Sequence, residues 1–300
     1  MGLFIAIIMF LAAFLLLRSE WEKVQLKTDH YEVRTDKLPE GVSKVRLVFV
    51  SDLHDYMPAR HTPEMITKAI DLVKPDAVIL GGDMITVSKS ERVPRPETKT
   101  ALSVISSIAG KYPVFYGEGN HETRLMEKNP EGYASYVSEI FSMGVRYLRD
   151  TGAEIPGTGV QVYGVNLSDD FYGRFPGIEK KYEMPERYIE GAIGEADRKN
   201  FNVFLIHIPL YLEEAEKAGA DLVLSGHYHG GTVRLPDGRG LMTPQYQFFK
   251  KECSGEFTYG KAKMIVGRGL GTHSIKIRIN DLPQIAVVDI TDEGTSKVQN

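Results

Sequence analysis

The chain has almost no cysteine and no strong excess of charge of either sign. Its 300 residues include one cysteine, Cys253. A single cysteine excludes an intramolecular disulfide and a cysteine-based zinc site, so any bound metal must be held by His, Asp, Glu or Asn. The 36 Lys and Arg residues against 40 Asp and Glu give a net charge of -4. Because general nucleic-acid binding needs a strongly basic face, no nucleic-acid partner is expected.

Charge is also missing from the N-terminus. Residues 1–17 carry no charged side chain, and Arg18, Trp21 and other polar residues follow directly. A bilayer core needs about 20 apolar residues, with a minimum of about 17. We therefore predict that residues 1–20 form a membrane anchor, with Trp21 and Arg18 at the interface.

Two alternatives to the anchor stay open. The first is a cleaved secretory signal, although no basic residue precedes the apolar run and no A-x-A-like site follows it. The second is a buried N-terminal helix of the globular domain. The flanking positive charges Arg18, Lys23 and Lys27 all follow the run. The positive-inside rule then predicts a single-pass protein of the cell membrane with its body on the cytoplasmic side.

The body of the chain alternates two patterns. Short apolar runs bounded by turn residues are typical of strands buried on both faces; they occupy residues 45–50, 77–80, 113–116, 202–206 and 222–225. Amphipathic stretches lie between the earlier runs and predict helices over residues 63–73, 97–109 and 132–142. The alternation predicts α/β layering.

The later part has strand-like runs without long helices, which predicts a second, partly antiparallel sheet packed on the first. These runs occupy residues 157–167, 231–236, 262–271 and 285–290. Residues 21–44 are polar and mixed, and we predict a linker and entry segment there. No Pro/Gly-rich segment divides the rest, so residues 45–300 are predicted to be one domain.

The five buried-type strands all run into residues that bind divalent metals through oxygen or imidazole. In order along the chain these residues are Asp52 and His54, Asp83, Asn120 and His121, His207, and His227 and His229. In open α/β sheets, ligands bind at the carboxyl ends of the strands. Each motif is common by itself, but buried ionisable clusters are costly unless they coordinate metal or form pairs. The set together therefore predicts a metal site.

The spacing within the motifs suits coordination. Asp52 and His54 are two residues apart, so in an extended segment both side chains point to one side and reach one ion. His227 and His229 repeat this spacing with two imidazoles. Asp83 follows two glycines and carries two oxygens, one for each of two metals.

The ordered set resembles the calcineurin-like metallophosphoesterase superfamily over residues 45–232. Its bacterial branch of membrane-associated phosphoesterases is the nearer match, because an apolar N-terminus precedes the domain and a Gly269-Leu270-Gly271 stretch with Arg278, Asn280 and Pro283 closes it. Glu122, where many members have Asp, and Tyr228, where that branch often has Thr, depart from the pattern. Neither change removes a ligand.

The resemblance implies a four-layer αββα sandwich of two mixed β-sheets and two divalent transition-metal ions. One ion would be held by Asp52, His54, Asp83 and His229. The other would be held by Asp83, Asn120, His207 and His227, with Asp83 bridging. Mixed nitrogen and oxygen ligands suit manganese, iron or zinc, and this choice stays open.

The expected function is phosphoester hydrolysis. Two ions can clamp a phosphoryl oxygen and hold a hydroxide that attacks phosphorus in line with the leaving oxygen. By its place in the motif, His121 is the expected catalytic residue, as a general acid or as a cation facing the leaving group. The alternative is that His121 only orients Asn120.

The substrate is the least determined part. The expected class is a phosphodiester or pyrophosphate, and the predicted anchor favours a lipid-linked or cell-envelope compound. Candidate lids are residues 84–96 and 168–186, with the basic residues Arg92, Arg95, Arg174, Lys180 and Lys181. Aromatic residues that either touch lipid or pack in the interior are Phe171, Tyr172, Phe175, Tyr246, Phe248 and Phe249. A non-catalytic binding module and a nuclease on the same fold are the alternatives.

Overall fold

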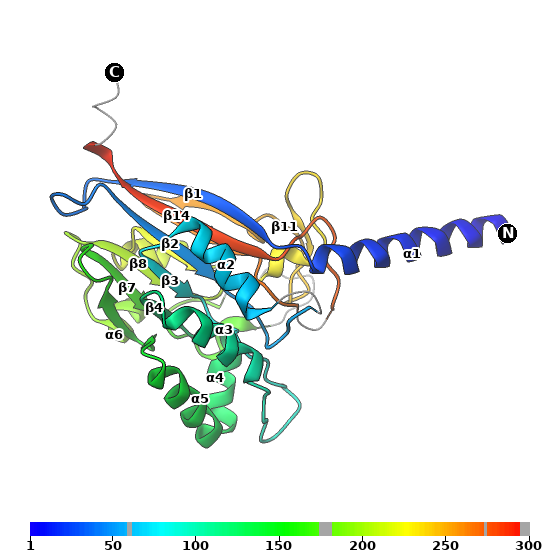
Figure 1. Cartoon of the computed structure of the whole chain (residues 1–300), viewed down its shortest axis with the longest axis horizontal. Helices are drawn as coiled ribbons and strands as arrows, with labels where there is room; N and C mark the ends of the chain where they lie inside the picture. Colours follow the sequence, from blue (N-terminus) through cyan, green and yellow to red (C-terminus); the bar gives the residue numbers. More distant parts are fainter. Residues whose placement is uncertain (59–61, 174–181, 273–274, 295–300) are drawn as a thin grey trace.

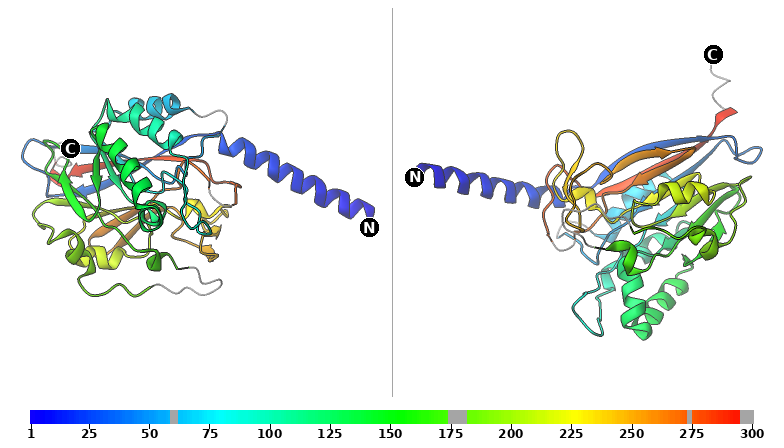
Figure 2. Two further views of the ribbon diagram at one scale, coloured as in Figure 1. Left: turned by 90° about the horizontal axis from the view of Figure 1, so that it is seen from below. Right: turned by 180° about the vertical axis from the view of Figure 1, so that it is seen from behind.

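The computed structural model describes residues 1–58, 62–173, 182–272 and 275–294. Two six-stranded sheets pack face to face at its centre, helices cover their outer faces, and one long helix projects from the domain (Figures 1 and 2). The predicted four-layer αββα sandwich of two mixed sheets is confirmed.

The first sheet is mostly parallel. Its strand order is β1-β14-β2-β3-β4-β5, and β14 runs antiparallel to β2 while every other neighbouring pair is parallel. The strands are β1 (Lys27–Thr35), β2 (Lys44–Val50), β3 (Ala77–Leu80), β4 (Val114–Gly117), β5 (Arg146–Leu148) and β14 (Gln284–Asp292). The parallel part requires crossover connections, and helices supply them.

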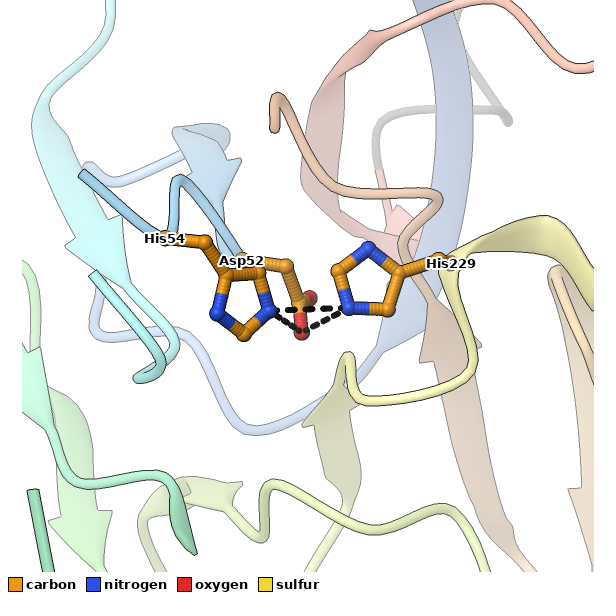
Figure 3. A group of neighbouring side chains, drawn as sticks. All are labelled: Asp52, His54 and His229. Carbon is orange, nitrogen blue, oxygen red and sulfur yellow. Dashed lines mark hydrogen bonds and ion pairs between the residues drawn. The ribbon is translucent and has the colours of Figure 1, made fainter. Parts of the chain in front are cut away.

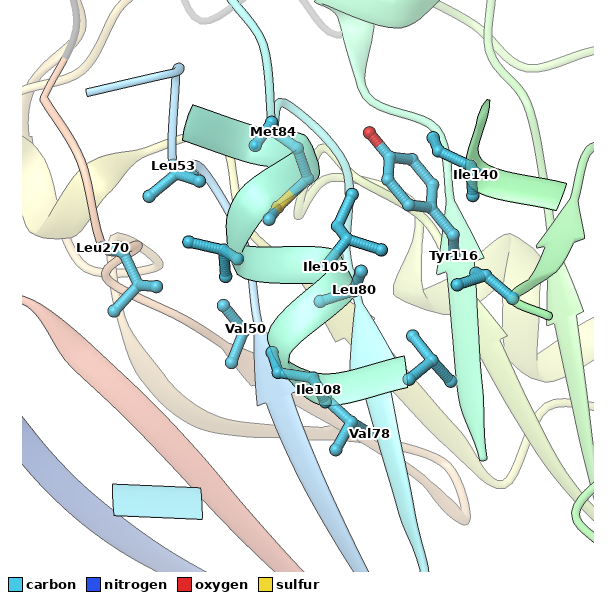
Figure 4. Close-up of a cluster of buried hydrophobic side chains, with 14 of the residues drawn as sticks. Val50, Leu53, Val78, Leu80, Met84, Ile105, Ile108, Tyr116, Ile140 and Leu270 are labelled. Atoms are coloured by element: carbon cyan, nitrogen blue, oxygen red, sulfur yellow. The ribbon is translucent and has the colours of Figure 1, made fainter. Parts of the chain in front are cut away.

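Four helices supply apolar side chains to the layer outside the first sheet. They are α2 (Pro63–Val73), α3 (Lys99–Ala109), α4 (Asn120–Lys128) and α5 (Pro130–Ser142). Figure 4 shows Ile105 and Ile108 of α3 packed on Val78 and Leu80 of β3. Helices α2, α3 and α5 cover the three helical stretches predicted from the sequence.

The second sheet has the order β12-β13-β9-β8-β7-β6, with antiparallel pairs at its two edges. Its strands are β6 (Thr151–Glu154), β7 (Val160–Gly164), β8 (Phe201–Leu205), β9 (Leu222–Ser225), β12 (Gly255–Tyr259) and β13 (Ala262–Val266). Two short helices cover its outer face: α6 (Tyr188–Ile193) and α7 (Leu212–Lys217). A small hairpin of β10 (Gly240–Met242) and β11 (Phe248–Lys250) lies beside it.

The continuous apolar runs are explained by burial on both faces. In β2, Leu47 and Phe49 point into the core between the sheets, whereas Val48 and Val50 point into the core under the helices. In β9, Leu222 and Leu224 join the core between the sheets, and Val223 packs on the opposite side. Because side chains alternate along a strand, a strand between two apolar layers needs apolar residues at every position.

Two predictions from the sequence are wrong. Residues 21–44 are not a linker, because β1 lies within them and pairs along its length with β14. Its sequence is mixed because it is an edge strand, with Val33 and Thr35 buried and most other positions partly exposed. Residues 231–236 do not form a strand: Val233 and Arg234 make only isolated bridges, and the positive φ angles of Gly231 and Thr232 turn the chain there.

Helix α1 (Gly2–Lys23) is long and apolar enough to cross a membrane, and 6% of its apolar window is buried. It projects away from the domain in every view (Figures 1 and 2). The alternative of a buried N-terminal helix is therefore wrong. Its last turns differ from the rest, because Ser19, Glu22 and Lys23 are buried against the domain.

Candidate metal centre

The eight candidate site residues lie together where β2, β3, β4, β8 and β9 end. Seven of their side chains are buried: Asp52, His54, Asp83, Asn120, His121, His207 and His227. His229 is partly exposed, with 14% of its side chain accessible. Both sheets contribute, so the site lies across the end of the sandwich where the parallel strands terminate.

Asp52, His54 and His229 form one group (Figure 3). The Nε2 atoms of His54 and His229 are 2.9 Å apart, and His229 Nε2 is 3.4 Å from Asp52 Oδ1. His54 Nε2 is 4.0 Å from the same oxygen. Two imidazole nitrogens and a carboxylate oxygen thus converge on one point, which suits a divalent cation.

A second group is formed by Asp83, His207 and His227. His207 Nε2 lies 3.1 Å from Asp83 Oδ2 and 3.6 Å from Asp52 Oδ1. The other ring nitrogen, Nδ1, is 2.7 Å from the Gly81 carbonyl oxygen, which fixes the ring and leaves Nε2 facing the carboxylates. Asp83 also groups with His54 and His121, and its Oδ2 atom lies within 4.0 Å of the Nε2 atoms of His54, His121 and His207.

Asn120 and His121 begin α4 and face the same cluster from the end of β4. The side-chain oxygen of Asn120 is buried and has no hydrogen-bond partner. A buried amide oxygen without a donor is costly, and a cation would satisfy it. His121 Nδ1 accepts a hydrogen bond of 2.6 Å from the backbone N–H of Val87, and its Nε2 is 4.0 Å from Asp83 Oδ2.

The backbone at the site is strained. Five of the predicted ligands have positive φ angles, a conformation that non-glycine residues rarely adopt: Asp52, His54, Asp83, His227 and His229. Glycines permit the close packing around them, since a Cβ on Gly82 would lie 2.2 Å from the backbone nitrogen of Gly119. Such strain is concentrated at functional sites, where the surrounding fold holds the side chains in position.

The charges in the cluster call for a cation. Burial raises the pKa of Asp52 to about 6. Burial alone would lower the pKa of His207, but the carboxylates of Asp83 and Asp52 outweigh it and raise that pKa to about 10. The negative charge of the two carboxylates thus favours a positive charge at this place, which a metal ion would supply. The mixed nitrogen and oxygen donors fit a divalent transition metal.

Glu122 holds together the backbone segments that carry the candidate ligands. Its buried carboxylate accepts hydrogen bonds from the backbone N–H groups of Asp83, Met84 and Gly119 at 2.9–3.0 Å and from the Tyr116 hydroxyl at 2.7 Å. Burial, and next the charge of Asp83, raise its pKa to about 7. Glu122 therefore ties the end of β3 to the start of α4.

Replacing Glu122 by alanine should lower the free energy of unfolding of the metal-loaded protein by about 3 kcal/mol or more, because several buried donors lose their acceptor at once. Urea denaturation measures this. The matched control is Glu127→Ala on the exposed side of the same helix, which should change the free energy by less than about 0.5 kcal/mol. Equal effects of the two substitutions would show that Glu122 does not hold the site.

The cluster opens into a cleft of about 450 Å³. Arg124, Tyr172 and Gln245 line it together with the histidines, and sequence reasoning missed all three as site residues. Arg124 is buried, and it donates to Asp169 at 2.7 Å and to the Val87 carbonyl at 3.2 Å. The Gln245 amide contacts His227 Nε2. Tyr172 belongs to the predicted lid 168–186, whereas Arg124 lies one turn after Asn120 on a helix that was not predicted.

The two predicted lids differ. Residues 84–96 border the cleft and contribute Lys89 and Arg95 to its lining, whereas Arg92 does not line it. In the second segment Phe171 and Tyr172 are buried, and four of the predicted residues lie outside the described part of the chain: Arg174, Phe175, Lys180 and Lys181. Three other aromatic residues are exposed: Tyr246, Phe248 and Phe249.

Comparison with known proteins agrees with this geometry. The sequence model of the calcineurin-like phosphoesterase family matches residues 45–231. An uncharacterized metallophosphoesterase of Aquifex aeolicus is 28% identical over 95% of this chain and 100% of its own length. A phosphodiesterase of Escherichia coli, YaeI, is 24% identical over 84% of each chain.

A third relative is named as a transmembrane protein. The transmembrane protein with metallophosphoesterase domain of Bos taurus is 23% identical over 85% of this chain, which spans 54% of that relative. The family match covers well over half of the chain and includes all eight candidate site residues. The chain belongs to the calcineurin-like phosphoesterase family and is a metal-dependent phosphoester hydrolase.

Proposed function

We propose that the protein is a dinuclear metal-dependent phosphodiesterase. One ion would be held by Asp52, His54, Asp83 and His229, and the other by Asp83, Asn120, His207 and His227. The observation that carries this proposal is the position of the Asp83 carboxylate between two groups of imidazoles. When bound, the two ions would act as Lewis acids toward the phosphoryl group and a water molecule.

His121 is proposed as the general acid. Its Nδ1 accepts the Val87 N–H, so in the neutral ring the proton is on Nε2. A nitrogen that carries a proton cannot coordinate a metal, but it can donate to an oxygen. Nε2 faces the cluster and the cleft, where it can protonate the leaving oxygen of a substrate.

The proposed substrate is a phosphodiester or pyrophosphate, with a lipid-linked or cell-envelope compound as the favoured kind. The guanidinium of Arg124 and the side chains of Lys89 and Arg95 line the cleft around the cluster, and cations there attract phosphate. The relative YaeI is a phosphodiesterase by name. A non-catalytic module on this fold is disfavoured because each of the seven proposed ligand positions carries a residue type that can bind a divalent metal.

The test is hydrolysis of bis-p-nitrophenyl phosphate by purified protein with and without added manganese. Chelation should abolish hydrolysis, and manganese, iron or zinc should restore it. A nuclease would instead cleave nucleic acid far faster than it cleaves small diesters. Activity that survives complete removal of transition metals, checked by elemental analysis, would refute the proposal.

We further propose that α1 is a single-pass anchor in the cell membrane and that the domain lies on its cytoplasmic side. The apolar run is exposed, and its flanking positive charges all follow it. A cleaved signal is disfavoured because Ser19 and Glu22, directly after the run, are bonded into the domain. Cleavage near them would remove part of the folded structure.

The intact protein should therefore fractionate with membranes and stay there in high salt, because the attachment of an apolar helix inserted in the bilayer does not depend on ionic strength. Western blotting of membrane and soluble fractions measures this. Protease added outside sealed cells should leave the domain intact. Release of the full-length chain by salt would contradict the anchor. Digestion of the domain in sealed cells would show that it lies outside the cytoplasm.

A further inference from the structure

The end of the domain from which α1 emerges carries exposed apolar side chains. Tyr246, Phe248 and Phe249 are on the β10–β11 hairpin and are 41%, 55% and 52% exposed. Trp21 on α1 is 59% exposed, and Ile275 is 42% exposed. We call these five residues the apolar rim. Figures 1 and 2 show the hairpin beside the base of α1.

The base of α1 is hydrogen-bonded to the domain. Ser19 Oγ accepts the backbone N–H of Arg278 at 3.0 Å, and Glu22 Oε2 accepts that of Asp281, also at 3.0 Å. Glu22 is also paired with Arg18 at 2.8 Å. The helix continues unbroken from the apolar run into these contacts. The helix is therefore joined to the domain by side-chain contacts as well as by the short connection from Lys23 to β1.

Residues 278–281, which hold the helix base, are also linked to the candidate metal centre through intermediate residues. The buried Arg278 guanidinium donates to the carbonyl groups of Arg268, Gly269 and Gly271 at 2.6–3.2 Å. Gly271 in turn donates to the Asp52 carbonyl at 2.8 Å. On the other side, Asp281 packs so closely on Gly230 that a Cβ there would lie 1.9 Å from its carboxylate. The helix base and the candidate ligands are thus joined through two short chains of contacts.

The strand directions place the site and the helix at one end. β14 runs antiparallel to β2, with Ala286 beside Phe49, so the start of β14 lies next to the end of β2. The candidate ligands follow β2, and the contacts with α1 directly precede β14. The metal-bearing face and the base of α1 therefore share one end of the sandwich.

The distance along α1 from the end of its apolar run to the domain shows how far the domain lies from the apolar part of the bilayer. The apolar run ends at Leu17, and Glu22 is five residues further, which is about 7.5 Å along the helix axis. The polar interface on each side of a bilayer is of similar thickness, about 5–8 Å. Groups at the end of the domain beside the helix base therefore reach the interface.

The composition of the rim fits that interface. Tryptophan and tyrosine are favoured at the headgroup level, phenylalanine inserts at the headgroup–acyl boundary, and Lys or Arg residues favour anionic lipid. Arg18, Lys251 and Lys276 are exposed around the rim. Glu20 is also exposed, but its carboxylate is paired with Lys23 at 2.6 Å.

We infer that the apolar rim contacts the headgroup–acyl boundary of the bilayer, so that the cleft takes its substrate from the membrane surface. This inference rests on the proposed anchor and names the substrate class of the proposed phosphodiesterase as an amphipathic, membrane-resident phosphoester. The occupant of the rim is the lipid surface itself, held there by the helix that enters it.

The test uses the full-length chain in phosphatidylcholine vesicles containing phosphatidylglycerol. An environment-sensitive fluorophore is attached at Phe248→Cys, and the control is Phe141→Cys, which is 57% exposed on α5. Cys253 is buried and stays unlabelled. We expect blue-shifted emission at position 248 and quenching by brominated lipid severalfold stronger than at position 141. Equal quenching at the two positions would overturn the inference.

A second measurement tests the consequence for catalysis. The double variant Phe248→Ser/Phe249→Ser should lose about tenfold in kcat/KM on a phosphodiester lipid in vesicles, because the apolar contact with lipid is lost. Its rate on soluble bis-p-nitrophenyl phosphate should be unchanged. Equal losses on both substrates would overturn the inference. An inactive enzyme with strong quenching at position 248 would refute the proposed function and leave the membrane contact standing.

Discussion

Asp83→Asn should remove both metal ions and reduce turnover by more than about 100-fold. The Oδ2 atom of the Asp83 carboxylate lies 3.1–4.0 Å from the Nε2 atoms of His207, His54 and His121. Loss of a residue that merely orients a ligand costs about 10–100-fold in metal affinity or activity. Loss of a ligand shared by two ions should cost more, because the neutral amide weakens both positions together.

The same substitution should also lower stability in the presence of metal. A ligand present at about 100 times its dissociation constant stabilises the folded state by about 2.7 kcal/mol, and this gain disappears with binding. Elemental analysis, turnover and thermal denaturation are measured on one preparation. The matched control is Asp36→Asn at an exposed position after β1, which should change none of the three. If Asp83→Asn retains two ions, Asp83 is not the ligand that the two ions share.

His121→Ala should have the second-largest effect on turnover, and it should leave the metal content unchanged. Metal content should stay at the wild-type level, because the proton on Nε2 excludes coordination through that nitrogen. Turnover should fall about 10²–10⁴-fold, as is typical of a positioned general acid. The loss should be greatest for diesters with a poor alkoxide leaving group and smallest for p-nitrophenyl esters, whose phenolate leaves without a proton.

The design compares metal stoichiometry with turnover on both kinds of substrate. His30→Ala, at an exposed position on β1, is the matched control and should retain full activity. If His121→Ala loses metal as completely as Asp83→Asn, His121 is a ligand. If turnover falls equally for good and poor leaving groups, the acid role fails and His121 orients Asn120 instead.

The sequence predicted the elements that are buried on both sides. Strands such as β3 and β9 are apolar at every position because both faces pack against a core. The candidate ligands follow such strands directly. Their order along the chain was therefore enough to predict which residues form the metal site. Edge strand β1 was missed for the opposite reason, because its outer positions are exposed and polar.

Residues that reach the site from loops could not be predicted. Gln245 contacts His227 from the loop between β10 and β11, and no local pattern marks that approach. Arg124 was missed because no helix was predicted over residues 120–128, where α4 begins at Asn120 and carries Arg124 one turn later. The contacts of Ser19 and Glu22 with residues 278–281 join positions far apart in the chain, and such pairings depend on the folded arrangement of both sheets.

The central claim is that two ions share Asp83. Anomalous diffraction from crystals grown with manganese tests it most directly, because the metal positions are observed rather than inferred. The predicted result is two peaks per chain, one beside His54 and His229 and one beside Asn120, His207 and His227, with the Asp83 carboxylate between them. A single peak in active protein, or two peaks that Asp83 does not touch, would contradict the account.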